Sequence, residues 1–360
     1  MESSYHFQDY IRPYWKGNQI TNETLMFVPN EKGEIEPAPL LFSPTEVLSV
    51  RSYNLQTSYQ EGKDYRIEDG KFVVLPGGSI PVWNRDEYYP PEYLPNQSFG
   101  CSLGNYIRYG EQDVFTRMQI AVTYRHEEKW CGVIPSFQGE RLPELMNKLK
   151  TNQRLNLVYY GDSITVGCNA SGWNDFPIPP YMPIWTDLVT KLLEEAYQNH
   201  NINAVNTAVG GTNSKWGIDE MEERLLAYEP DLAMLAFGMN DHSLPAEDFK
   251  NQILEIIQKT RTKYPKTEFV LISTTLPNRE AAGFFVNQEQ YEAALADLVM
   301  NTPGTVLVPI TSIHRYLLTK KRFLDMTGNN INHPNDFVVR AYAQAVGSVL
   351  VPSDLYPSET

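Results

Sequence analysis

The sequence predicts an α/β protein, with an N-terminal β-sandwich of the jelly-roll type followed by a three-layer α/β/α domain around a five-stranded parallel sheet. Short apolar runs alternate with helical stretches after residue 150. Before it, the strand patterns are short and a proline-rich, aromatic segment interrupts them. We therefore expect an accessory domain at 1–150 and a second domain at 151–360.

The first half carries hairpin and strand signals. Residues 65–74 place an Asp-Gly pair between two apolar stretches, as in a tight hairpin, and residues 118–124 alternate large apolar residues at a period of two. Prolines crowd 76–98, which favours an ordered loop. The polar, partly helical segment 142–152 is the expected linker.

In the second half, strand patterns alternate regularly with helix patterns, which predicts right-handed crossovers with helices on both faces of the sheet. The expected strands are 155–160, 204–209, 232–237, 269–273 and 306–310, and the expected helices are 183–199, 218–229, 246–263, 287–300 and 337–350.

Composition limits the partners. The chain has 30 basic and 44 acidic residues, which argues against nucleic acid or an anionic membrane as a partner. No run of 18 apolar residues is present, and the N-terminus lacks the features of a secretory signal, so we expect a cytoplasmic protein. The three cysteines are widely spaced, which favours reduced thiols.

A serine follows the first strand of the second half, in the turn Gly161-Asp162-Ser163. Chemistry in an open parallel sheet gathers at the carboxyl ends of the strands, where a sharp turn can expose a nucleophile. The later strand ends contribute the Gly210-Gly211 pair and Asn240-Asp241, and His333 precedes the last helix.

Together these residues suit acyl transfer. His333 can activate the Ser163 hydroxyl as a general base at neutral pH. The oxyanion of a tetrahedral intermediate needs fixed donors, which the Ser163 N–H, the Gly211 N–H and the Asn240 amide could supply. Gly210 is the alternative to Gly211. No metal or cofactor is required.

The four blocks resemble those of the SGNH hydrolases, the GDSL esterase superfamily, over residues 155–350. The resemblance implies a flavodoxin-like fold and ester hydrolysis through an acyl-serine, with Ser163 as nucleophile and His333 as base. The family usually carries aspartate three residues before the histidine, whereas this chain has Asn330. We therefore expect a Ser163–His333 dyad oriented by Asn330 or a backbone carbonyl. Asp336 is expected to have a structural role, since Asn335 or Asp336 would cap the last helix.

The two-part architecture is similar to the family two carbohydrate esterases, which remove acetyl groups from plant cell-wall sugars, and several of which lack the aspartate. This second resemblance implies a sugar substrate. Candidate substrate contacts are Trp216, as a stacking platform, Trp173, His242 and Asp162, although Asp162 is expected to hydrogen-bond within its own turn. His314 is the other candidate base, with a surface role favoured. Trp83 and the Tyr88-Tyr89 pair could cover the site.

The sequence therefore predicts a serine esterase that removes short acyl groups, above all acetyl, from carbohydrate. An acetylated oligosaccharide or another small ester is the expected substrate, and homo-oligomerisation stays open. Three alternatives use the same residues: a lipid or thioester hydrolase, a carbohydrate-binding protein with an inactive hydrolase domain, and a transacylase.

Overall fold

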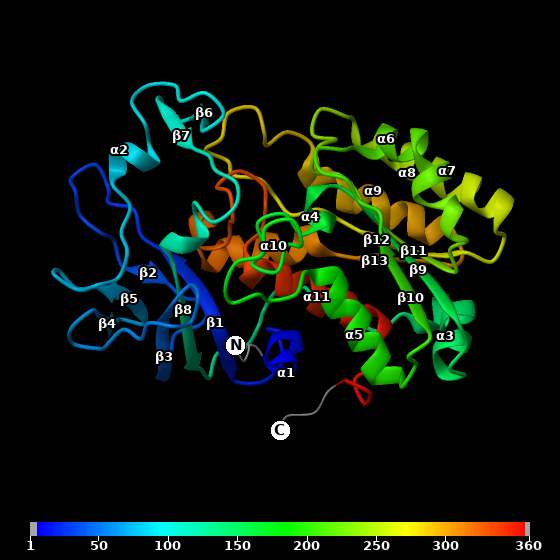
Figure 1. Ribbon diagram of the computed structural model, residues 1–360, viewed down its shortest axis with the longest axis horizontal. Helices are drawn as coiled ribbons and strands as arrows, with labels where there is room; N and C mark the ends of the chain where they lie inside the picture. The colour runs from blue at the N-terminus through cyan, green and yellow to red at the C-terminus, as the bar shows by residue number, and fades with distance from the viewer. Residues whose placement is uncertain (1–5, 357–360) are drawn as a thin grey trace.

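A computed structural model describes residues 6–356. Small antiparallel sheets fill one side of the molecule, and a parallel sheet flanked by helices fills the other (Figure 1). Segments near the C-terminus, including α10 (Ile310–Lys320) and α11 (Asp336–Leu350), lie between the two sides. The predicted fold class is confirmed.

The parallel sheet has five strands in the order β10-β9-β11-β12-β13. The first strand along the chain thus lies between the second and the third, which makes its carboxyl end a topological switch point. The strands are β9 (Leu155–Gly161), β10 (Ile202–Asn206), β11 (Leu232–Ala236), β12 (Glu268–Ile272) and β13 (Thr305–Val308). Each overlaps one of the five predicted runs. β10 lies at 202–206 instead of the predicted 204–209, and β13 ends before Pro309, the residue that precedes α10.

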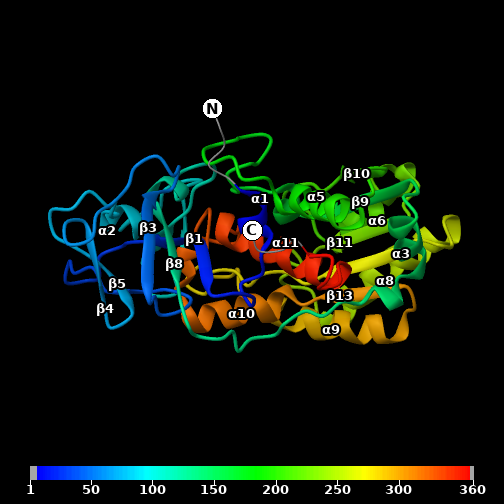
Figure 2. The ribbon, with the colours of Figure 1, turned by 90° about the horizontal axis from the view of Figure 1, so that it is seen from below.

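Two helical layers cover this sheet (Figure 2). One layer contains α5 (Trp185–Tyr197) and α11, and the other contains α6 (Ser214–Asp219), α7 (Met221–Arg224), α8 (Ala246–Lys263) and α9 (Gln288–Asn301). The predicted helix 218–229 is replaced by α6, α7 and the 3-10 turn η3 (Leu226–Tyr228). Its start moves to Ser214 because the Asn213 side chain caps α6, accepting from the Trp216 N–H at 2.9 Å.

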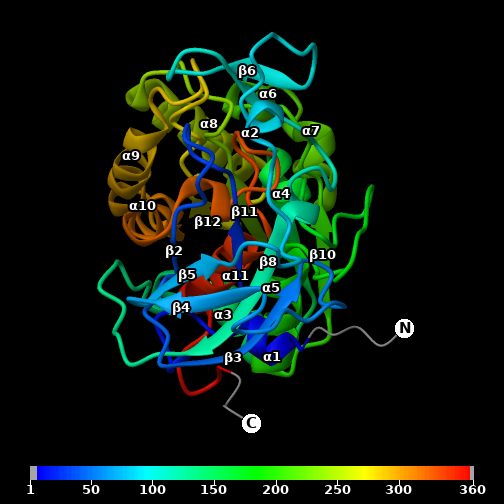
Figure 3. The same cartoon turned by 90° about the vertical axis from the view of Figure 1, so that its left-hand side faces the viewer.

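The N-terminal side contains three antiparallel sheets (Figure 3). They comprise β1 (Gln19–Met26), β8 (Gln119–Arg125) and β3 (Glu46–Ser52); β2 (Ala38–Pro39), β5 (Lys71–Val74) and β4 (Tyr65–Glu68); and β6 (Ser98–Gly100) with β7 (Tyr106–Arg108). The hairpin predicted at 65–74 is confirmed, with Asp69 and Gly70 both at positive φ. Two short helical turns, α2 (Arg85–Tyr88) and η1 (Thr116–Met118), lie on this side, whereas α1 (Phe7–Ile11) packs against α5 and α11 and η2 (Gly139–Arg141) packs against α3.

The segment expected to be a linker is a packed helix, α3 (Pro143–Lys150). Leu145 and Leu149 are buried, and α3 contacts both β9 and α5. The Glu268 carboxylate accepts from the N–H groups at Glu144 and Leu145, at 3.1 and 2.8 Å. The apolar core also runs without a break from Phe7 to α11. The two sides therefore share one core.

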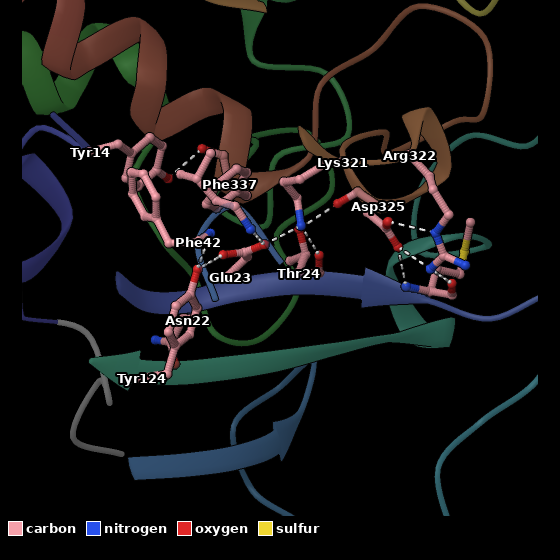
Figure 4. A network of polar contacts seen from close by, with 12 residues as sticks. Tyr14, Asn22, Glu23, Thr24, Phe42, Tyr124, Lys321, Arg322, Asp325 and Phe337 are labelled. Carbon is pink, nitrogen blue, oxygen red and sulfur yellow. Dashed lines mark hydrogen bonds and ion pairs between the residues drawn. The ribbon is translucent and has the colours of Figure 1, made fainter. Parts of the chain in front are cut away.

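A buried polar network joins β1 to the segment after α10 (Figure 4). The Lys321 ammonium pairs with the Glu23 carboxylate, and both side chains are fully buried. Glu23 also accepts from the Tyr124 hydroxyl at 2.7 Å. Four residues further along, in η4 (Phe323–Asp325), the Asp325 carboxylate accepts from the Met26 N–H at 2.9 Å. This network fixes the chain just before the loop that carries His333.

Within residues 6–356, none of the helices combines the length and apolar character that a membrane span requires.

Candidate active site

The nucleophile turn is built by a helix cap. β9 ends at Gly161, and α4 (Ser163–Val166) begins directly after Asp162. The buried Asp162 carboxylate accepts from the Ile164 N–H at 3.0 Å. Burial, reinforced by the charge of Asp241, raises the pKa of Asp162 to about 7. The expected hydrogen bond of Asp162 within its own turn is therefore present, and its role as a substrate contact stays a prediction.

Ser163 and His333 lie in hydrogen-bond contact, as the sequence predicts. The His333 Nε2 atom is 2.8 Å from the Ser163 Oγ atom. Both side chains are largely buried, with 5% of Ser163 and 8% of His333 exposed. A neutral imidazole that accepts from the serine hydroxyl at this distance has the geometry of a general base.

The His333 loop is organised by one asparagine that the sequence reasoning overlooked. The Asn329 Oδ1 atom accepts from three successive N–H groups, at Ile331, Asn332 and His333, each at 3.0 Å. Gly328 lies against Asn169, where a Cβ atom would come within 2.6 Å of the Asn169 Cβ. Glycine is therefore needed for the His333 loop to approach the nucleophile segment.

Asn330 does not orient His333, so that expectation is wrong. Its buried side chain accepts from the Tyr88 hydroxyl at 2.8 Å and donates to the Arg108 carbonyl at 3.0 Å. Asn330 thus fastens the loop to the N-terminal side. Its φ of +71° is a left-handed conformation that asparagine tolerates better than most residues.

Asn169 occupies the place predicted for Asn330. The His333 Nδ1 atom is 2.6 Å from the Asn169 Oδ1 atom. An amide oxygen can only accept, so this contact assigns the proton to Nδ1 and leaves Nε2 free to accept from Ser163. The Asn169 Nδ2 group donates to the Gln112 carbonyl at 3.1 Å, which fixes the orientation of the amide.

A carboxylate also stands behind His333. The Glu111 Oε2 atom lies 3.4 Å from His333 Nδ1. Glu111 belongs to the N-terminal side, on the loop after β7. The Asp336 carboxylate, which is nearest to His333 in sequence, instead accepts from the Ser171 N–H at 2.7 Å. Helix α11 is capped by Asn335.

The expected oxyanion donors follow the carboxyl ends of β9, β10 and β11, which are neighbours in the parallel sheet. Ser163 offers the first amide of α4, and first-turn amides have no acceptor within their own helix. Asn240 is half-buried, and its amide donates to the Thr212 carbonyl at 2.8 Å. Gly211 is exposed at a φ of +76°, with no heavy atom within 4 Å of a Cβ position. At Gly210, such a Cβ would lie 3.8 Å from the Ser163 Cβ. Both glycines remain candidates.

The other aromatic and histidine candidates have different positions. Trp216 packs beside Tyr160 in the second core cluster, an arrangement that does not favour a sugar platform. His314 is buried rather than on the surface. Its Nδ1 accepts from the Leu276 N–H at 3.0 Å, and burial lowers its pKa to about 3. Trp173 and His242 are half-buried, and each has a buried ring nitrogen without a hydrogen-bond partner among the described residues.

The N-terminal aromatics serve packing and loop anchoring. Trp83 and Tyr88 are buried and pack edge-to-face with a centroid distance of 5.9 Å. Cys168 is also buried, and burial together with the charge of Glu111 raises the pKa of its thiol to about 12. A thiol in that state is a poor competitor for the nucleophile role.

Residues 159–339, half of the chain, match the model of the GDSL-like Lipase/Acylhydrolase family. The chain belongs to this family. The matched residues contain the Ser163 turn, both glycines, Asn240 and His333, so the family blocks and the observed cluster coincide.

Individual likenesses to this GDSL-like chain are more distant. A two-domain esterase active on acetylated mannans, co-crystallized with mannopentaose, is 20% identical with a TM-score of 0.47, and the match covers 63% of this chain and 59% of that one. The acetylxylan esterase Axe2 from Geobacillus stearothermophilus is 16% identical with a TM-score of 0.45, covering 57% of this chain and 95% of that one. An uncharacterized protein from Mycoplasma pneumoniae is 23% identical over 141 residues, which are 37% of this chain and only 15% of that protein.

Sequence reasoning missed Asn169 and Glu111 for different reasons. Asn169 follows the nucleophile helix at a φ of +64°, and asparagine beyond a short helix is a recognisable signal for that conformation. Glu111 carries no such signal. It is one of 44 acidic residues, and a long stretch of sequence separates it from the GDSL-like blocks.

Proposed function

We propose that this GDSL-like protein is a serine esterase that removes short acyl groups, in the first place acetyl, from carbohydrate. The observation that carries the proposal is the unbroken hydrogen-bond chain from Ser163 Oγ through His333 to Asn169 Oδ1. It provides a hydroxyl nucleophile, a base in contact with it and an acceptor that fixes the base.

In the acylation half-reaction, Ser163 Oγ attacks the ester carbonyl while His333 Nε2 takes the hydroxyl proton. The negative charge that develops on the carbonyl oxygen meets the Ser163 N–H, the Gly211 N–H and the Asn240 amide. The intermediate then collapses, the bond to the sugar oxygen breaks, and His333 returns the proton to that oxygen. The products of this half-reaction are the free sugar hydroxyl and an acyl-serine.

Deacylation repeats these steps with water. His333 removes a proton from water as its oxygen attacks the acyl carbonyl, and the same donors hold the oxyanion. Collapse breaks the bond to Ser163 Oγ, which regains its proton from His333. The carboxylic acid leaves, and the enzyme returns to its starting state.

Two features support a small acyl group on a polar alcohol. Ser163 is 5% exposed, which favours a small acyl group over a bulky one. The loop after the nucleophile helix carries the exposed side chains of Asn174 and Asp175, which suit hydroxyl groups better than an alkyl chain.

The test compares acetyl and octanoyl 4-nitrophenyl esters, followed by acetylated xylo- and manno-oligosaccharides, with Ser163→Ala as the control. We expect faster hydrolysis of the acetyl ester and release of acetate from at least one oligosaccharide, both abolished in the variant. A preference for the octanoyl ester would favour a lipid hydrolase. Equal rates for the variant and the wild type would overturn the enzymatic proposal.

A further inference from the structure

We propose that Glu111 is a positioning residue for His333, supplying from the N-terminal side the carboxylate that the SGNH blocks of this chain lack, so that both sides together complete the active site. This inference rests on the proposed function. It gives residues 1–150 a direct part in the chemistry, beyond any contact with substrate.

The geometry leaves one oxygen of Glu111 free for this role. Its Oε1 atom accepts from the Tyr109 hydroxyl and, at 3.4 Å, from the Asn329 amide. Its Oε2 atom is buried, has no hydrogen-bond partner among the described residues, and lies 3.4 Å from His333 Nδ1. A buried carboxylate oxygen without a donor is costly unless a positive charge forms beside it. The imidazolium that forms during catalysis is such a charge.

Glu111 is ionised in this position. Burial raises the pKa of its carboxyl group, but the neighbouring His333 ring and the hydrogen bonds from Tyr109 and Asn329 outweigh burial and leave the pKa below its ordinary value. The carboxylate is therefore present as a negative charge over the neutral pH range in which His333 must act.

The other titratable groups near His333 cannot take this role. Burial raises the pKa values of Tyr109 and Cys168, so both are neutral at pH 7. His314, which lines a small cavity with His333, is neutral because burial lowers its pKa to about 3. The Asp162 carboxylate is held by the cap of α4.

Asn169 and Glu111 divide between them what one aspartate does in a triad. Asn169 accepts from Nδ1 at 2.6 Å and so fixes the tautomer of His333. Glu111, farther from the same nitrogen, contributes charge when the ring is protonated. Both depend on one N-terminal segment, because the Gln112 carbonyl accepts from the Asn169 amide at 3.1 Å.

Hydrogen bonds between the N-terminal side and the His333 loop hold Glu111 and His333 in place relative to each other. The Gln119 amide donates to the Thr327 carbonyl at 2.7 Å, at the start of the His333 loop. At its end, the Asn335 amide donates to Thr24 Oγ1 at 3.0 Å. Between them, Asn330 donates to the Arg108 carbonyl, three residues before Glu111. The Glu111 carboxylate and the loop that carries His333 are thus both held by the short segment from Arg108 to Gln112.

The experiment is the pH profile of kcat/KM for acetyl 4-nitrophenyl ester with wild type, Glu111→Gln and Glu111→Asp. Glu87→Gln is the matched control, because Glu87 is an exposed carboxylate of the same N-terminal side. We expect Glu111→Gln to lower the plateau about 10- to 100-fold through kcat, with KM little changed, because it removes a charge that acts as the imidazolium forms. The fall should stay below the roughly 10,000-fold of a lost tautomer, since Asn169 remains.

The decisive readout is the acidic limb of the profile. Without the carboxylate, protonation of the base becomes less favourable, so the midpoint of this limb should move to lower pH by about one unit in Glu111→Gln. It should stay near the wild-type value in Glu111→Asp and Glu87→Gln. If Glu111→Gln does not fold, Glu111→Asp decides alone: retention of the midpoint and most of the activity supports the proposal, and loss of either overturns it.

A wild-type plateau and midpoint in Glu111→Gln would overturn the inference, and so would a lower plateau with an unmoved midpoint, which indicates a merely structural role. Failure of the proposed function is distinct from these results, because it would appear as wild-type protein without hydrolysis that depends on Ser163.

Discussion

Asn330→Asp separates the family pattern from the observed geometry. The substitution introduces aspartate three residues before His333, which the SGNH resemblance would predict to complete a triad. The observed side chain instead points to Tyr88 and Arg108 and is fully buried. An ionised carboxylate there would place an oxygen where the amide now donates to the Arg108 carbonyl, 3.0 Å away. We therefore expect destabilisation without a gain in activity.

The size of the expected loss of stability follows from the protonation state of the new carboxyl group. A neutral carboxyl group could still accept from Tyr88 and donate to the Arg108 carbonyl, so the folded state should hold the proton. The pKa of this carboxyl group in the folded state is then raised above the unfolded value of about 3.9, and the deficit in folding stability relative to the wild type is absent below that pH. The deficit grows by about 1.4 kcal/mol per pH unit above it, reaching about 1.5 kcal/mol at pH 5 and about 4 kcal/mol at pH 7.

Urea denaturation at pH 5 and pH 7 measures this difference, and kcat/KM on the acetyl ester is measured alongside. Asn96→Asp is the matched control, because Asn96 also has positive φ (+59°) but is exposed. It should change stability by less than about 0.5 kcal/mol. If Asn330→Asp were as stable as the wild type at pH 7 and raised kcat/KM, or restored Glu111→Gln, the geometric reasoning would be refuted.

Three further predictions test the oxyanion site, the buried pair and the neutral histidine. Asn240→Ala should lower kcat about 100- to 1,000-fold with little change in KM or stability, and a fall below about threefold would remove Asn240 from the oxyanion site. Lys321→Met should destabilise the protein by about 3–5 kcal/mol in denaturant titrations, because it leaves the Glu23 carboxylate buried without its cation. The control is Lys320→Met, because Lys320 is partly exposed. Equal losses of stability in the two variants would contradict the argument. The folded pKa of His314 lies near 3, below the unfolded value of about 6.5, so its contribution to stability is present above pH 6.5 and should fall by about 2 kcal/mol by pH 5. His314→Asn should flatten this part of the stability–pH curve. An unchanged slope in the variant would argue against a neutral buried ring.

The sequence predicted those features that depend on neighbouring residues. Each strand of the parallel sheet is a short apolar run, and both helical layers follow from alternation with those runs. The Ser163 turn and His333 were predictable because parallel strands bring their carboxyl ends to one edge. The residue that accepts the hydrogen bond from His333 Nδ1 was not predictable in this way. Asn330 had the family spacing, but its φ of +71° and its bonds to Tyr88 and Arg108 turn it away.

The N-terminal side was the least predictable part because its role depends on contacts distant in sequence. A division at residue 150 describes a change in pattern, from antiparallel strands to βα units. The core does not divide there, since buried residues from Phe7 to α11 form one cluster. Glu23 neutralises Lys321, Gln119 and Thr24 hold the two ends of the His333 loop, and Glu111 lies beside the imidazole. Each of these contacts joins a residue before 126 to one after 320. Under the role proposed for Glu111, the N-terminal side is a part of the active site rather than an appendage to it, and substitutions on either side of the molecule would change catalysis.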